Sequence, residues 1–149
     1  MSLVKQGAYE IVQAPAREAA LDLVVPFTTP ELTRASLRAA DRLGAGLNSV
    51  VRLLRFQIVP FPLKLEESPV LLNFMKEQLQ QLDSELPLHS EIVLTRDFDA
   101  ALKNTLGPGS VVVLATRKRP WRTRTERLAA RLTRDGRKVI LVRQGDHDA

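Results

Sequence analysis

The feature that most constrains the fold of this sequence is a regular alternation of short apolar segments with amphipathic helices. Five segments have the length and β-branched composition of strands: 21–25, 49–59, 89–94, 110–115 and 139–142. Four helices are predicted between them, and their expected N-cap residues are Thr29, Ser68, Asp97 and Thr123. This alternation predicts an α/β fold, a five-stranded parallel sheet with right-handed crossovers and helices on both faces.

A length of 149 residues corresponds to one domain. The predicted strands and helices all lie within residues 21–143, which form the expected domain. Residues 1–20 are interpreted as an arm or linker that can add one edge strand, and residues 144–149 as a polar tail. The longest uncharged stretch, 104–116, is too short to cross a bilayer, and the absence of cysteine favours a reducing, cytoplasmic setting.

Positive charge gathers near the C-terminus. The whole chain has a net charge of +5, yet the part from Ala115 onward holds eleven basic and only four acidic residues. Within it, a basic stripe recurs at helical spacing on the last predicted helix: Arg124, Arg127, Arg131 and Arg134. An anionic ligand or partner is therefore expected to interact with this region.

Four runs of sequence resemble those of a known family: 22–26 before a capped helix, 53–60 entering a proline-containing loop, 110–115, and 138–142. Over roughly residues 20–143 the chain resembles the universal stress protein family. The resemblance implies the strand order 3-2-1-4-5, an adenine nucleotide alpha hydrolase-like sheet, and a non-enzymatic regulatory or sensing function. Val25-Pro26 and Val59-Pro60 further resemble the cytoplasmic domains of this type that are fused to amino-acid and other secondary transporters.

Many members of that family bind ATP with an Asp after the first strand and a glycine motif after the fourth. Here Pro26, Phe27 and Thr28 follow the first strand, and no glycine occurs between Gly109 and Gly136. Phosphate must approach bare backbone N–H groups, and a side chain obstructs that approach. We therefore expect no cofactor and no ATP bound in the family's usual manner, which leaves ATP or AMP only the alternative of a site without that motif.

A basic loop stands in place of the glycine motif. If strands 21–25 and 110–115 are neighbours, a crevice opens at their carboxyl ends. The candidate anion-binding residues there are Thr28, Thr29, Thr116, Arg117, Lys118, Arg119, Trp121 and Arg124. Two helix N-termini and the guanidinium groups can hold a phosphate, while the indole ring can stack on a base or on an arginine. The alternative interpretation is a solvated loop whose tryptophan covers the edge of the sheet.

The sequence offers no support for catalysis or for a metal site. His89 and His147 lack an Asp or Ser partner at a recognisable spacing, and Glu66 and Glu67 suit the dipole of the following helix. No catalytic or metal-binding residue is therefore assigned. Sparse aromatic residues and the lack of a recognition motif argue against a nucleic-acid partner. Docking of the basic surface on anionic lipid is a weaker hypothesis.

Self-association or contact with a partner domain is the expected mode of action. The family often dimerises through its last strand, so the resemblance implies a homodimer whose edge consists of Val139, Ile140, Leu141 and Val142. The alternative function is a nucleotide- or phosphate-binding module that uses the basic loop.

Overall fold

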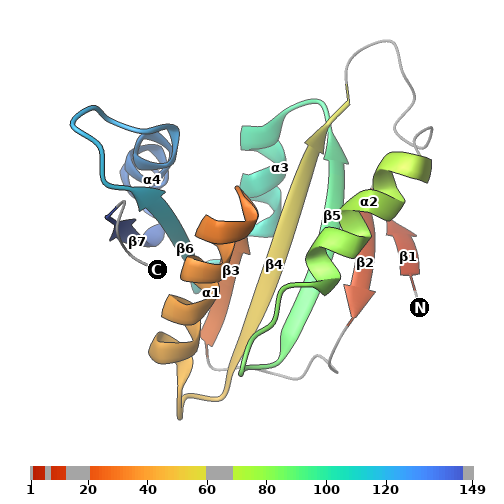
Figure 1. Ribbon diagram of the computed structural model, residues 1–149, viewed down its shortest axis with the longest axis horizontal. Coiled ribbons are helices and arrows are strands. Elements are labelled where there is room, and N and C mark those ends of the chain that lie inside the picture. The colour runs from red at the N-terminus through yellow and green to blue at the C-terminus, as the bar shows by residue number, and fades with distance from the viewer. Residues whose placement is uncertain (1, 6–7, 13–20, 60–68, 146–149) are drawn as a thin grey trace.

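The computed structural model describes residues 2–5, 8–12, 21–59 and 69–145, which form a seven-stranded sheet and four helices (Figure 1). The strands are β1 (Ser2–Lys5), β2 (Ala8–Val12), β3 (Leu21–Pro26), β4 (Ser49–Ile58), β5 (Leu88–Thr95), β6 (Ser110–Arg117) and β7 (Lys138–Gln144). The helices are α1 (Pro30–Gly44), α2 (Pro69–Gln80), α3 (Phe98–Thr105) and α4 (Arg124–Arg134). None of the helices in these ranges is both long and apolar enough to span a bilayer.

The strands follow the order β1-β2-β5-β4-β3-β6-β7. The five strands from β5 to β7 are all parallel, which confirms the predicted α/β fold and the order 3-2-1-4-5. In the central pairing, Val24 of β3 lies opposite Arg52 of β4 and Val112 of β6. The N-terminal segment contributes two strands rather than one, because β1 pairs antiparallel with β2, which itself pairs antiparallel with β5.

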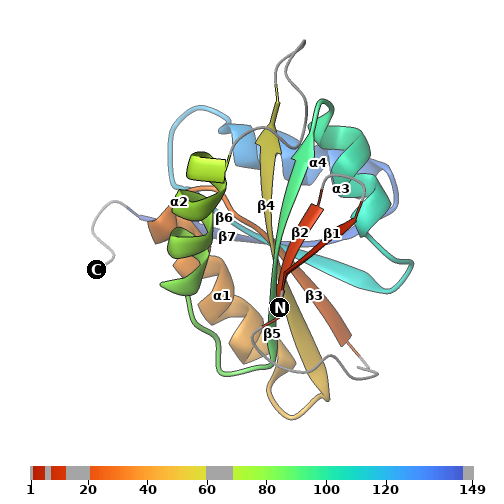
Figure 2. The same ribbon diagram turned by 90° about the vertical axis from the view of Figure 1, so that its right-hand side faces the viewer.

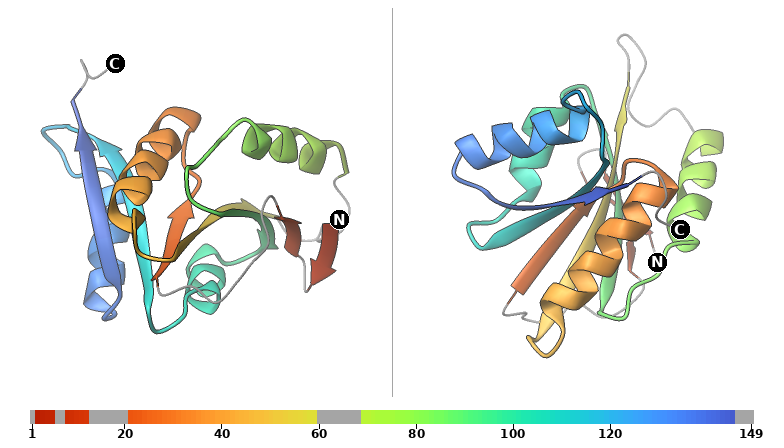
Figure 3. Two further views of the ribbon diagram at one scale, coloured as in Figure 1. Left: turned by 90° about the horizontal axis from the view of Figure 1, so that it is seen from below. Right: turned by 60° about the vertical axis from the view of Figure 1, so that its left-hand side comes forward.

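The four helices cover both faces of the sheet. Figures 2 and 3 show α1 and α2 on one face and α3 and α4 on the other. Because side chains alternate along a strand, Leu23 and Val25 of β3 join the core under α1 and α2, whereas Val24 joins the core under α3 and α4. This two-sided burial explains why the central strands read as continuous apolar runs.

The helices begin where their sequence signals predict. The hydroxyl of Thr29 accepts the N–H of Leu32 at 3.2 Å, and the carboxylate of Asp97 accepts that of Ala100 at 3.2 Å. At α4 the predicted capping box is present in both directions. The predicted cap at Ser68 and the loop before it, with Glu66 and Glu67, lie outside the described residues.

A polar cluster joins three strands near their amino ends. The carboxylate of Asp22 accepts Nε and Nη2 of Arg52 at 2.9 and 2.8 Å, and the hydroxyl of Ser110 at 2.6 Å. Nη2 of Arg52 also donates to the carbonyl oxygen of Thr105, the last residue of α3, at 2.8 Å. The cluster therefore ties β3, β4, β6 and α3 together at the end of the sheet opposite the carboxyl ends of the strands.

Candidate anion-binding site

An open groove of about 450 Å³ lies at the carboxyl end of the sheet, on the face covered by α3 and α4. Its lining residues are Thr28, Phe98, Arg124, Thr125, Arg127, Leu128 and Arg131. Thr28 follows β3, Phe98 begins α3, and the other five belong to the first turns of α4. The strand order reverses between β3 and β6, and the crevice beside such a reversal is where open α/β sheets bind ligands.

Three arginines give the groove its positive charge. Arg124 and Arg127 have no acidic partner among the described residues, whereas Nη2 of Arg131 lies 3.2 Å from a carboxylate oxygen of Asp99. All three side chains are exposed. Like charges three residues apart on a helix repel each other, so an anion between Arg124 and Arg127 removes an unfavourable interaction as well as adding a favourable one.

At the starts of α1 and α4, a side chain already accepts one backbone N–H of the first turn. At α1, the hydroxyl of Thr29 takes the N–H of Leu32. At α4, the hydroxyl of Thr123 takes the N–H of Glu126 at 3.1 Å, while the carboxylate of Glu126 takes the N–H of Thr123 at 3.0 Å. Three arginine side chains line this groove, in contrast to the bare backbone N–H groups that a glycine motif presents to phosphate.

Of the predicted site residues, Thr29, Thr116 and Arg117 connect elements and do not line the groove. The side chain of Thr116 is buried, with 2% of the residue exposed, and its hydroxyl lies 2.6 Å from that of Thr123. Arg117 forms an ion pair with Glu31 in the first turn of α1. These contacts fasten the end of β6 to the starts of α1 and α4.

Lys118, Arg119 and Trp121 lie in the loop between β6 and α4 and are also absent from the groove lining. The backbone N–H of Lys118 donates to the carbonyl of Gln144 at 2.7 Å, which extends the contact with β7. Trp121 is 64% exposed, and its ring centroid lies 6.0 Å from the guanidinium carbon of Arg119. The ring of Trp121 is therefore mostly exposed to solvent, and the guanidinium group of Arg119 lies over it.

Thr28 and Arg124 are thus the two predicted residues that the structure brings together in the groove. Sequence reasoning placed Arg127 and Arg131 only in a basic stripe, although their spacing relative to Arg124 was a usable signal. No sequence feature predicted that Phe98 lines the groove, because Phe98 follows β5, a strand that is not adjacent to β3 or β6.

The proposed dimer edge lies at one side of the sheet. β7 pairs with β6, and no other described strand pairs with it. Val139 and Leu141 pack on the α4 side and Val142 on the α1 side, whereas Ile140 is 38% exposed. The N-terminal hairpin lies at the opposite edge, so it does not cover β7 (Figure 1).

The residues described contain no cluster of three or more histidine and acidic side chains able to hold a metal ion. His89 lies in β5 and does not line the groove, and His147 lies outside the described residues. Comparison with protein-family models gives no match for this chain, and no curated protein matches it.

Proposed function

We propose that this chain is a non-enzymatic sensing domain that binds a small phosphate-bearing anion in the groove at the start of α4. The observation that carries this proposal is the convergence of Arg124, Arg127 and Arg131 on one groove of about 450 Å³. Two of these arginines have no acidic partner in the described part of the chain. Guanidinium groups bind phosphate through paired, charge-assisted hydrogen bonds, which makes phosphate the favoured anion.

The other lining residues suit a ligand larger than inorganic phosphate. Thr28 offers a hydroxyl beside the arginines, and Phe98 and Leu128 offer apolar surface. A groove of this size and mixed character accepts a phosphate with an attached ring, such as a nucleotide. This site replaces the family's usual glycine motif with side-chain donors.

The test is calorimetric titration with inorganic phosphate, pyrophosphate, AMP, ATP and cyclic dinucleotides at two salt concentrations. We expect saturable binding that weakens as salt increases, because the ligand contacts are charged. The double substitution Arg124→Ala and Arg127→Ala is expected to weaken binding at least about tenfold, since each charge-assisted hydrogen bond contributes about 1.5–3 kcal/mol.

Arg134→Ala is the matched control, because it removes the same charge from the exposed surface of the same helix but lies outside the groove. The affinity of the Arg134→Ala variant for each anion is expected to stay within about twofold of the wild-type affinity. Unchanged affinity in the double variant, or no binding of any anion in the panel, would contradict the proposal.

A second proposal is homodimerisation through β7. The open edge of a parallel sheet exposes unpaired backbone groups, and Ile140 adds an exposed apolar side chain in the middle of the strand. If two copies of β7 pair about a two-fold axis, the unpaired backbone groups form hydrogen bonds and Ile140 becomes covered. Contact with a partner domain through the same edge is the alternative outcome.

The wider context is also a proposal. The order 3-2-1-4-5 is the order that the resemblance to universal stress proteins implies, and β3 ends in Val25-Pro26, as in the domains fused to transporters. On this basis we assign the chain to a universal-stress-protein-like regulatory type, as a cytoplasmic domain with a transporter parent. Binding of the purified domain to a transporter's remaining chain is the measurement that tests this assignment.

A further inference from the structure

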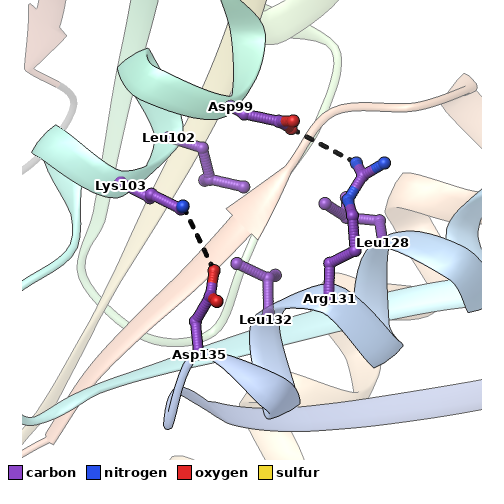
Figure 4. A pocket seen from close by; sticks show the side chains of 7 residues that line it. All are labelled: Asp99, Leu102, Lys103, Leu128, Arg131, Leu132 and Asp135. Carbon is purple, nitrogen blue, oxygen red and sulfur yellow. Dashed lines mark hydrogen bonds and ion pairs between the residues drawn. The ribbon is translucent and has the colours of Figure 1, made fainter.

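The side chain of Arg131 lines two neighbouring hollows of the surface. It lines the anion groove, and it also lines a separate cavity of about 40 Å³ between α3 and α4 (Figure 4). In that cavity its guanidinium group faces the carboxylate of Asp99, with Nη2 to Oδ1 at 3.2 Å. The charged side chain of Arg131 thus connects the proposed ligand site with the contact between the two helices.

The contact between α3 and α4, here called the helix seam, consists of two ion pairs with leucines between them. Asp99 faces Arg131, and one turn further along both helices Lys103 Nζ lies 3.3 Å from Oδ2 of Asp135. Leu102 and Leu132 are buried between the pairs. The two helices therefore run in the same direction, and the Asp99–Arg131 pair is the one adjacent to the groove.

The ion pair beside the groove is weak. Both of its side chains are about half exposed, so water and salt screen their attraction and the ion pair is weak. A phosphate held by Arg124 and Arg127 carries more charge than one carboxylate and accepts both N–H groups of a guanidinium fork. The buried leucines, Leu102 and Leu132, keep the two helices packed together when the first pair opens.

We propose that, when an anion binds in the groove, Arg131 breaks its ion pair with Asp99 and binds the anion instead. Ligand binding would thereby release the contact that Asp99 makes at the start of α3. This inference rests on the proposed function and adds its regulation. Asp99 competes with the ligand for Arg131, and its charge sets the affinity of the groove.

A double-mutant cycle tests the exchange with pyrophosphate as the probe. Asp99→Asn is expected to tighten binding about three- to fivefold, because Arg131 no longer has to leave a carboxylate. In an Arg131→Ala background the same change is expected to alter affinity less than about twofold. Amide hydrogen exchange in the first turn of α3 is expected to accelerate on binding in the wild type but not in Asp99→Asn.

Asp135→Asn is the matched control, because it removes the same charge from the other ion pair of the helix seam. Its effect is expected to stay below about twofold in both backgrounds. If Asp99→Asn strengthens pyrophosphate binding equally with and without Arg131, the exchange is overturned. The effect would then come only from removing a negative charge near the groove. Normal pyrophosphate binding with no coupling therefore refutes the exchange alone, whereas absence of binding in the wild type overturns the proposed function as well.

Discussion

At the scale of single residues, the carboxylate of Asp22 in β3 contacts Arg52 of β4 and Ser110 of β6. Burial alone raises the pKa of its carboxyl group, but the hydrogen bonds from Arg52 and Ser110 and the charge of Arg52 outweigh burial and lower the pKa below its ordinary value. The ionised form is therefore bound more strongly in the folded chain than in the unfolded one. Its contribution to stability is complete above the unfolded pKa of about 3.9 and is lost as pH falls through the lower folded pKa.

Asp22→Asn is expected to lower the free energy of unfolding by about 1–3 kcal/mol at neutral pH, because Arg52 loses its charged partner. The difference from the wild type is expected to shrink as the pH is lowered below about 4. Urea unfolding between pH 2 and 7 measures both effects. Asp83→Asn is the control, because this exposed carboxylate forms no ion pair within the described residues. If the difference in unfolding free energy between Asp22→Asn and the wild type stayed constant from pH 2 to 7, the link between stability and the ionisation of Asp22 would be contradicted.

The candidate site shows what residue patterns reveal and what they do not. The position of Thr28 could be predicted from strand order alone, since it follows the strand at the reversal point. The structural roles of Thr116 and Arg117 could not, because their partners, Thr123 and Glu31, are identified only once the chain has folded. A basic residue in a crevice looks the same in sequence whether it binds a ligand or a neighbouring helix.

At the scale of elements, strands and helix starts are predicted well because their signals are local. Hydroxyl and carboxylate caps and β-branched runs act within a few residues of where they occur. Helix faces are predicted less well. The spacing of apolar residues in α1 and α2 would place Leu43 and Phe74 on the buried faces, yet these residues are 39% and 53% exposed. Periodicity gives the direction of a face but not its width, which depends on what packs above it. β1 and β2 lack any such pattern, and pairing with β5 defines them.

The capping box of α4 provides a prediction at this scale. Thr123→Ala removes the acceptor for the N–H of Glu126 and also the hydroxyl that meets Thr116. We expect a loss of about 1 kcal/mol in the free energy of unfolding. Thr123→Ser keeps the hydroxyl and is expected to retain most of the stability. Chemical unfolding of the three proteins measures the difference, and equal losses in both variants would show that the hydroxyl is not the stabilising group.

The molecule as a whole presents two unlike edges. At one edge the short hairpin of β1 and β2 extends the parallel sheet, and at the other β7 ends it with seven residues, Lys138–Gln144. Their relation follows from strand order, which local signals do not encode. The resemblance to a known family supplied the order of the parallel strands, but it did not supply the hairpin.

Dimerisation through β7 is tested by Ile140→Asp. Two copies of this strand facing each other bring two aspartates together, so the dimer is expected to dissociate to a folded monomer. Sedimentation velocity over a range of protein concentrations measures the change. Ile58→Asp introduces the same charge at an exposed isoleucine in β4 and is expected to leave the dimer intact. A wild-type chain that stays monomeric at high concentration would refute the dimer.

The unequal edges also bear on fibre formation. Pairing of β7 with β7 is self-complementary and stops at two copies, whereas pairing of β7 with β1 of the next copy leaves a free edge at each step and can continue without limit. β1 offers only the four residues Ser2–Lys5 for such a junction, and a short strand is a poor template for further strands. We therefore expect the short β1 edge to disfavour the open-ended pairing of β7 with β1 that would build filaments.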